Sequence, residues 1–273
     1  MAHQQLAAYE EAKQQASEQP EAFWEAIANQ FEWHQKWDKT LEYDFHKPEV
    51  KWFLGGKVNI TENCLDRHLI TQPDQTAIIF EPNDPKEAAQ HISYKELHSR
   101  VCQVANMLKA NGAKKGDRIC LYMPMVPELA ITVLACARIG AIHSVVFAGF
   151  SAAALAARIN DADCSLLVTA DGGFRGAKVT PLKDIADDAL THCSTIKTSI
   201  VLKRTGQEVA WNDIDVWWHE ALEEVDDNCP AEIMDSEDPL FILYTSGSTG
   251  KPKGMVHTCG GYMVYTAYSF HEY

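Results

Sequence analysis

Two hydrophobic spacings alternate along most of the chain. From Thr76 onward, short apolar runs alternate with stretches in which apolar residues recur at helical spacing. This rhythm predicts β-strands joined by helices, which is typical of an α/β fold with parallel strands. Strands are expected at 77–80, 118–122, 143–147, 165–169, 199–202 and 241–245. We therefore predict layered sheets with flanking helices.

Capping residues mark the expected helix boundaries. Ser93 and Glu96 form a capping box at the start of one helix, which Gly112 ends. Pro127 opens the next helix and Gly140 closes it. Further helices are expected at 151–160, 181–193 and 214–224.

The first 66 residues are rich in Trp, Glu and Lys and show little strand pattern. Glu21 to Gln35 is predicted to be one amphipathic helix, because Phe23, Trp24 and Ile27 recur at helical spacing. The rest of this region is expected to be irregular chain that aromatic side chains hold in place. A domain boundary is therefore expected at residue 66.

Charge and composition exclude several classes of protein. The 38 acidic residues outnumber the 24 basic ones, giving a net charge of −14, which disfavours binding to nucleic acid or to an anionic membrane. The N-terminus lacks the basic start and apolar stretch of a secretion signal, so a cytoplasmic protein is expected. Arg138 and His143 interrupt the most apolar region, 129–150, so no membrane span is expected. The cysteines are scattered singly, so we expect no structural zinc or other metal site.

The most informative segment is 244–254, YTSGSTGKPKG, which follows an apolar strand. Its glycines allow backbone N–H groups to approach an anion, its hydroxyls can donate hydrogen bonds, and its lysines supply positive charge. This inventory suits a polyphosphate, although the same composition also occurs in solvated turns. The P-loop of kinase-like NTPases is disfavoured, because Pro252 follows Lys251 where that motif needs Ser or Thr.

This segment resembles the phosphate-binding loop of adenylate-forming enzymes, a superfamily that includes acyl-CoA synthetases and luciferases. The resemblance implies activation of a carboxylate by ATP. The ATP-phosphate residues it implies are Thr245, Ser246, Gly247, Ser248, Thr249, Gly250 and Lys251. It places no catalytic residue within this chain and implies Mg²⁺ ligands elsewhere. His257 is expected to pack at the start of the next helix.

Other segments resemble the AMP-forming acetyl-CoA synthetase family. These are 63–68, 122–125, 137–141, 145–151 and 171–178. The resemblance implies a CoA site at Phe147, Ala148, Gly149, Arg175, Gly176, Ala177 and Lys178. Taken alone, Arg175 and Lys178 would be solvated loop charges, but a guanidinium fork and a compact ammonium both suit a phosphate. Ala148 and Lys178 stand where relatives often carry Gly and Arg.

The implied activity is ligation of acetate to CoA with ATP. Residues 1–66 are similar to the N-terminal extension of these enzymes. Residues 67–273 are similar to an AMP-binding domain truncated after the phosphate loop, so the chain is expected to be an inactive N-terminal fragment. Related propionate or acetoacetate ligases, a non-catalytic nucleotide- or CoA-binding module, and a kinase-type NTPase remain as alternatives. Small-molecule substrates are expected as partners, and the oligomeric state is not indicated.

Overall fold

The structure, a computed structural model, describes residues 2–246 and 250–272. They form two compact units, one of residues 1–63, 233–238 and 258–273, the other of residues 64–232 and 239–257. Within the described ranges, no helix combines the length and the apolar character that crossing a membrane requires. The boundary expected at residue 66 stays a prediction.

The first unit combines helices with two small antiparallel sheets. Its elements are α1 (Ala2–Glu18), α2 (Pro20–Ala28), β1 (Lys39–Asp44) paired with β2 (Glu49–Leu54), β3 (Lys57–Val58) paired with β13 (Met234–Asp235), and α9 (Cys259–Glu272). The Trp24 ring lies 6.1 Å from that of Trp52 and 5.7 Å from that of Tyr268. The predicted anchoring role is confirmed for Trp52, but it is wrong for Tyr43 and Phe45, which are exposed.

The helix predicted from Glu21 to Gln35 is too long, because α2 ends at Ala28. A side chain there satisfies a carbonyl that a further helical turn would use. The Trp33 indole donates to the Ala28 carbonyl at 2.9 Å. A helix can end where side chains replace its own backbone donors.

The prediction of irregular chain after this helix is also wrong, because residues 39–54 form the β1–β2 hairpin. Leu41 is paired with Trp52 in its register. Most positions of both strands are exposed, so apolar and polar residues do not alternate clearly along them. A strand formed chiefly by hairpin pairing carries little of the hydrophobic pattern that predicts strands.

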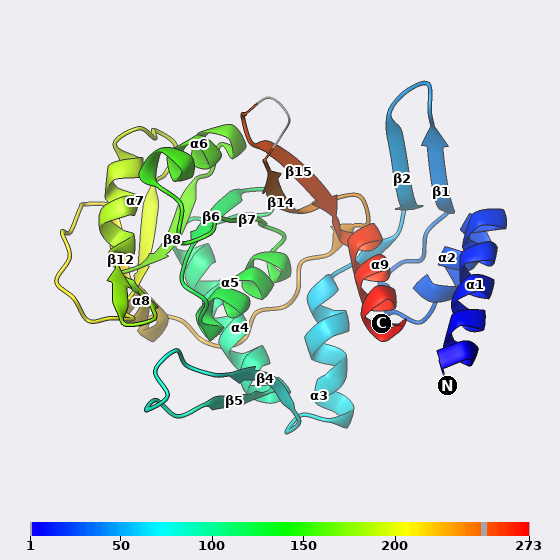
Figure 1. The fold of residues 1–273 in the computed structure, drawn as a ribbon, viewed down its shortest axis with the longest axis horizontal. Coiled ribbons are helices and arrows are strands. Elements are labelled where there is room, and N and C mark those ends of the chain that lie inside the picture. The colour runs from blue at the N-terminus through cyan, green and yellow to red at the C-terminus, as the bar shows by residue number, and fades with distance from the viewer. Residues whose placement is uncertain (1, 247–249, 273) are drawn as a thin grey trace. The chain divides into compact units, whose positions relative to one another are not determined.

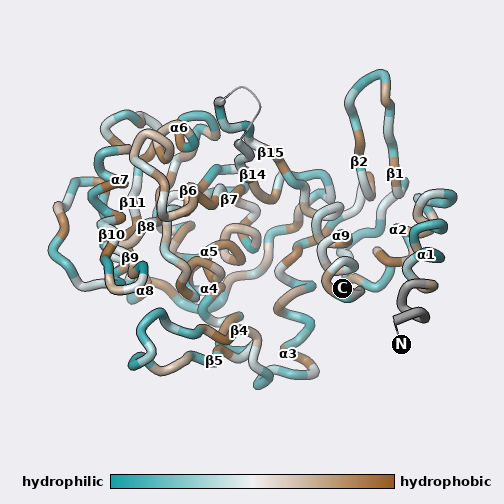
Figure 2. Tube along the Cα trace, in the orientation of Figure 1, coloured by the Kyte–Doolittle hydropathy of each residue, from teal (hydrophilic) through white to brown (hydrophobic). Residues whose placement is uncertain are grey.

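The second unit is built on a seven-stranded sheet in the order β12-β11-β8-β6-β7-β14-β15. Its strands are β6 (Arg118–Tyr122), β7 (Ile142–Val145), β8 (Leu166–Ala170), β11 (Thr198–Leu202), β12 (Asp215–Trp217), β14 (Pro239–Thr245) and β15 (Lys253–Thr258). Neighbours from β12 to β14 are parallel. Figure 2 shows the apolar strands inside a more polar outer layer. The predicted α/β fold is confirmed.

Helices in the second unit pack on this sheet or on one another. They are α3 (Arg67–Thr71), which follows a π-helical turn (Glu62–Asp66), α4 (Tyr94–Ala110), α5 (Pro127–Arg138), α6 (Ala152–Ala162), α7 (Leu182–Leu190) and α8 (Trp218–Glu223). The helix α4 packs against α5, and α6 packs against α7. The chain moves from β6 to β7 through α5 and back to β8 through α6. Right-handed crossovers in opposite directions place α5 and α6 on opposite faces of the sheet.

Local capping signals predicted several boundaries correctly. Ser93 Oγ accepts a hydrogen bond from the Glu96 backbone N–H at 3.2 Å at the start of α4. Ser151 Oγ accepts from the Ala154 N–H at 3.4 Å at the start of α6. Two hairpins complete the unit, β4 (Thr76–Phe80) with β5 (Gln90–Ser93), and β9 (Gly173–Arg175) with β10 (Lys178–Thr180).

Two predictions in this unit are wrong at the sheet edges. The helix expected from Ile214 to Glu224 is divided into β12 and the short α8, because 215–217 pair with β11. His257 lies in β15 rather than at a helix start, with its ring stacked 4.5 Å from that of Phe241. Edge strands form through pairing with a distant neighbour, which a local pattern does not reveal.

Candidate functional site

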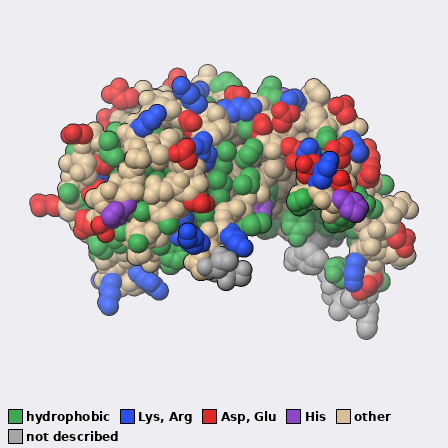
Figure 3. All heavy atoms as spheres, turned by 90° about the horizontal axis from the view of Figure 1, so that it is seen from above, with side chains coloured by type: hydrophobic (Ala, Val, Ile, Leu, Met, Phe, Trp, Pro, Cys, Tyr) green, Lys and Arg blue, Asp and Glu red, His purple; other side chains and the backbone are tan. Residues whose placement is uncertain are grey.

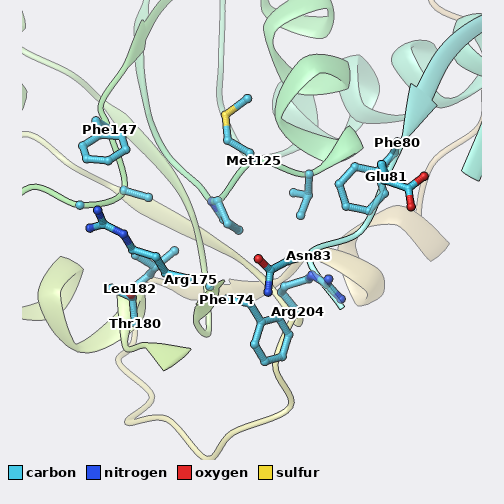
Figure 4. Close-up of a pocket in the computed structure, with 15 residues that line it drawn as sticks. Phe80, Glu81, Asn83, Met125, Phe147, Phe174, Arg175, Thr180, Leu182 and Arg204 are labelled. Atoms are coloured by element: carbon cyan, nitrogen blue, oxygen red, sulfur yellow. The ribbon is translucent and has the colours of Figure 1, made fainter. Parts of the chain in front are cut away.

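A cavity of about 450 Å³ opens at the carboxyl end of the parallel strands. Its walls come from the turns after β4, β6, β7, β8 and β11. Figure 4 shows Phe147 and Arg175 on one side of the cavity and Phe80 and Glu81 on the opposite side. The connections after β6 and after its neighbours leave to opposite faces of the sheet. Such a switch point is where open α/β sheets commonly bind ligands.

The turn after β7 holds the first group of predicted CoA residues. Phe147, Ala148 and Gly149 all line the cavity. The Tyr122 hydroxyl donates to the Phe150 carbonyl at 2.8 Å, which ties this turn to the end of β6, and burial raises the pKa of Tyr122 to about 12. A Cβ at position 149 would overlap the exposed Phe147 ring, so glycine there allows the ring to lie against the turn. The turn is therefore a fixed wall with an exposed aromatic ring.

The β9–β10 hairpin holds the second group. Arg175 lines the cavity and lies opposite Lys178 in the hairpin register. Like charges facing each other across a hairpin are unfavourable unless an anion joins them. Gly176, which has φ of 60°, and Ala177 form the turn, and with Lys178 they lie outside the cavity lining. The structure thus brings Arg175 to the 147–149 turn, but not the three residues that follow it.

A buried carboxylate that the sequence analysis missed fixes the turn after β11. Asp171 is fully buried at the end of β8, and its two oxygens accept backbone hydrogen bonds from Gly172, Arg204, Thr205 and Gly206 at 2.6–3.1 Å. Charge-assisted bonds of this kind are stronger than neutral ones. An Asp followed by two glycines at the end of an apolar strand is the signal that could have indicated this role.

The predicted phosphate loop begins at the same edge of the sheet, because β14 runs parallel to β7. Thr245 and Ser246 at the end of β14, and Gly250 and Lys251 before β15, are all exposed. Gly247, Ser248 and Thr249 lie outside the described residues. The four described residues are accessible to a ligand.

Tyr244 anchors the strand that leads into this loop. Its hydroxyl donates to Asp161 Oδ2 on α6 at 2.7 Å. Burial and, next, the neighbouring Asp161 carboxylate raise the pKa of Tyr244. The Arg158 guanidinium lies 5.4 Å from the Tyr244 ring centroid and 4.6 Å from that of Phe150, within cation–π range of both. One side chain of α6 therefore contacts both the strand before the loop and the turn of the cavity.

Charges of both signs surround these features. The face in Figure 3 mixes acidic with basic side chains and presents no single broad basic area. Among the described residues, no cluster of three His, Cys, Asp or Glu side chains is arranged to hold a metal ion. Recognition of an anion here therefore depends on individual side chains at the cavity and the loop.

The parallel sheet, with a cavity and the exposed ends of a hydroxyl-rich segment at its carboxyl edge, has the layout of an open α/β domain that binds a ligand at this edge. Residues 65–273 match the family model described as AMP-binding enzyme, and residues 9–64 match that described as acetyl-coenzyme A synthetase N-terminus. The chain belongs to the AMP-binding enzyme family.

Individual relatives agree with this assignment. The chain is 53% identical to an acetyl-coenzyme A synthetase from Alkalilimnicola ehrlichii, covering 97% of this chain and 41% of the relative. It is 55% identical to an acetyl-coenzyme A synthetase from Saccharophagus degradans, covering 93% and 40%. The structure of acetoacetyl-CoA synthetase from Streptomyces lividans matches with a TM-score of 0.84 at 26% identity, covering 92% and 38%. The chain thus spans about 40% of the length of these curated relatives.

Proposed function

We propose that the complete protein carrying this chain ligates acetate to CoA in two steps. An acetate oxygen attacks the α-phosphorus of MgATP, forming acetyl-adenylate and releasing pyrophosphate. The CoA thiol then attacks the acetyl carbonyl, forming the thioester and releasing AMP and a proton. The observation that carries this proposal is the identity above 50% with acetyl-coenzyme A synthetases along nearly the whole chain.

Each site has a part in this scheme. The loop from Thr245 to Lys251 would hold the β- and γ-phosphates and stabilise the charge that develops on pyrophosphate. The cavity that Phe147 and Arg175 line would hold the nucleotide end of CoA. A stacking ring and a guanidinium beside an apolar wall suit an adenine with a phosphate. Gly176, Ala177 and Lys178, which lie outside the cavity lining, would contact CoA from the hairpin turn at the edge of the cavity.

The proposal is tested by acid-dependent ATP–pyrophosphate exchange in the complete protein. Acetate is expected to support faster exchange than propionate or acetoacetate. Faster exchange with propionate or acetoacetate than with acetate would show that acetate is not the preferred acyl substrate. Hydrolysis of ATP without any carboxylate would overturn the whole proposal.

Lys251→Ala is expected to lower the exchange rate by about 100-fold, since it removes a cation aimed at charge that develops in the transition state. The matched control is Lys47→Ala, which removes the same charge from an exposed turn of the other unit. The control should exchange at the parent rate. An equal loss in both variants would contradict the role of Lys251.

Arg175→Ala is expected to raise the KM for CoA by about 10- to 100-fold, because one charge-assisted hydrogen bond contributes about 1.5–3 kcal/mol. Exchange with acetate should stay within about twofold of the parent, because exchange reports only adenylate formation, in which CoA takes no part. Arg100→Ala is the control, since Arg100 pairs with Glu96 on α4 outside the cavity lining. Equal losses in both half-reactions would contradict a CoA role for Arg175.

A further inference from the structure

A second arginine lines the cavity on a turn that the family resemblance does not include. Arg204 follows β11, and its guanidinium carbon lies 5.1 Å from the centroid of the Phe174 ring. Figure 4 shows both side chains near Asn83, apart from Phe147 and Arg175. Two guanidinium groups therefore reach the cavity from separate turns of the sheet edge.

Arg204 is held at its backbone. Its N–H donates to Asp171 Oδ1 at 2.8 Å, and the next two residues of the turn donate to the same carboxylate. The Gln207 side chain adds a bond to the Asp171 carbonyl at 2.7 Å. Because several hydrogen bonds to one buried carboxylate hold the backbone of this turn, the Cα of Arg204 has a fixed position. Less conformational entropy is then lost when the Arg204 side chain binds a ligand.

The guanidinium of Arg204, by contrast, is held by an ion pair that a ligand can replace. Its Nη2 lies 3.1 Å from Glu87 Oε2, and the two side chains are 23% and 40% exposed. Ion pairs this exposed contribute about 0–1 kcal/mol. In the described part of the chain, no ion pair of Arg175 is present. A phosphate entering the cavity could thus take Arg204 from Glu87 at little cost.

Glu87 belongs to the segment that joins β4 to β5. The same segment carries Asn83, which lines the cavity and whose Nδ2 donates to the Gly176 carbonyl at 2.9 Å. This segment therefore contacts both arginine-bearing turns, one through an ion pair and one through a hydrogen bond. It leaves a carboxylate beside Arg204 when the cavity holds no ligand.

We propose that Arg204 is a specificity-determining residue that binds the ribose 3′-phosphate of CoA, and that Glu87 competes with this phosphate for its guanidinium. The inference rests on the proposed CoA site. A phosphate monoester carries nearly two negative charges and can accept both bonds of a guanidinium fork. The 5′-diphosphate of CoA has similar chemistry, and 3′-dephospho-CoA separates the two sources.

The test uses two variants that break the same ion pair in the complete protein, Arg204→Gln and Glu87→Gln. Dissociation constants for CoA and for 3′-dephospho-CoA are measured by isothermal titration calorimetry. Arg204→Gln should raise the dissociation constant for CoA about 10-fold. Glu87→Gln should lower it about threefold, because the carboxylate that competes with the phosphate is gone. Binding of 3′-dephospho-CoA should change less than about twofold in both variants, since it lacks the phosphate.

The two variants are expected to change the affinity for CoA in opposite directions, which distinguishes ligand binding by Arg204 from a purely structural role of the ion pair. Two variants that both weaken CoA would overturn the proposal, because the ion pair would then only hold the 81–89 segment. Equal weakening of CoA and 3′-dephospho-CoA by Arg204→Gln would assign Arg204 to the diphosphate and also overturn it. Arg204→Lys, which keeps the charge but not the fork, should weaken CoA less than Arg204→Gln and provides the test if the latter does not fold.

The outcome is independent of acyl chemistry. Calorimetry reports CoA binding even if acetate supports no ATP–pyrophosphate exchange, in which case the proposed function fails and Arg204 is still tested. If acetate supports ATP–pyrophosphate exchange but both variants change the CoA dissociation constant in the same direction, only the role of Arg204 is overturned. Absence of CoA binding by the parent protein would overturn both. Arg100→Gln, outside the cavity lining, serves as the matched control and should leave both dissociation constants unchanged.

Discussion

Replacing Lys183 with methionine is expected to lower the free energy of unfolding by about 3–5 kcal/mol, because removing one partner of a buried ion pair leaves its carboxylates uncompensated. Lys183 is fully buried in α7, and its Nζ lies 2.6 Å from Asp187 Oδ1 and 2.8 Å from Asp215 Oδ2. It also donates to the Ala210 carbonyl at 3.3 Å. One ammonium thus joins α7 to the start of β12 and to the chain before it.

The carboxylates would lose the group that balances them. Burial raises the pKa of Asp187, and Lys183 is the largest influence that lowers it. Asp215 Oδ1 is buried and has no hydrogen-bond partner in the described part of the chain. Methionine fills most of the space of lysine, so the loss should come from charge rather than from a cavity.

Urea unfolding of the complete protein, followed by tryptophan fluorescence, measures this effect. Lys114→Met, at an exposed turn, is the matched control and should shift stability by less than about 0.5 kcal/mol. Adding Asp187→Asn and Asp215→Asn to Lys183→Met should restore at least half of the loss, since no buried charge then remains unpaired. A loss below about 1 kcal/mol in the single variant would contradict this account.

Asp171→Ala is expected to cost about 3–5 kcal/mol of stability and to weaken CoA binding as well. The change leaves the N–H groups of Gly172, Arg204, Thr205 and Gly206 without their acceptor beside the cavity. Each unsatisfied buried donor costs about 1–3 kcal/mol, although relaxation of the turn makes the sum smaller. The turn that carries Arg204 should then lose its fixed position.

Asp171→Asn separates the two effects. It keeps the shape and one accepting oxygen but turns an amide NH₂ toward backbone donors, so an intermediate loss of about 1–3 kcal/mol is expected. Asp188→Asn, on the exposed face of α7, is the control. Thermal unfolding and calorimetric titration with CoA measure both properties. Unchanged stability of Asp171→Ala would show that the turn holds without this carboxylate.

The elements predicted with correct boundaries are those that local interactions define. Strand β6 has the bounds Arg118–Tyr122 that its apolar run predicts, and α4 starts after Ser93 because its own third residue supplies the capped N–H. The loop from Thr245 to Lys251 was visible because its residues are contiguous. All of these signals lie within a few residues of the structure that they indicate.

The incorrect predictions concern elements that form through pairing with another segment. Strand β12 forms because Ser199 pairs with Asp215, and the β1–β2 hairpin forms although most of its residues are exposed. In both cases the deciding hydrogen bonds involve a segment whose own hydrophobic pattern is weak. Local sequence therefore predicted helix or irregular chain there.

By itself the sequence determined the α/β class and five strands of the central sheet, β6, β7, β8, β11 and β14, and it pointed to the segment predicted to bind phosphate, because burial patterns and turn chemistry act over short stretches. Only the tertiary structure decided which turns share the cavity. Arg175 and Arg204 reach it because β8 and β11 are neighbours in a sheet whose order differs from the chain order. Asp171 gained its role in the same way, since its hydrogen-bond donors at 204–206 come from the turn after that neighbouring strand. Strand order depends on packing among helices and strands far apart in sequence, and no single segment encodes it.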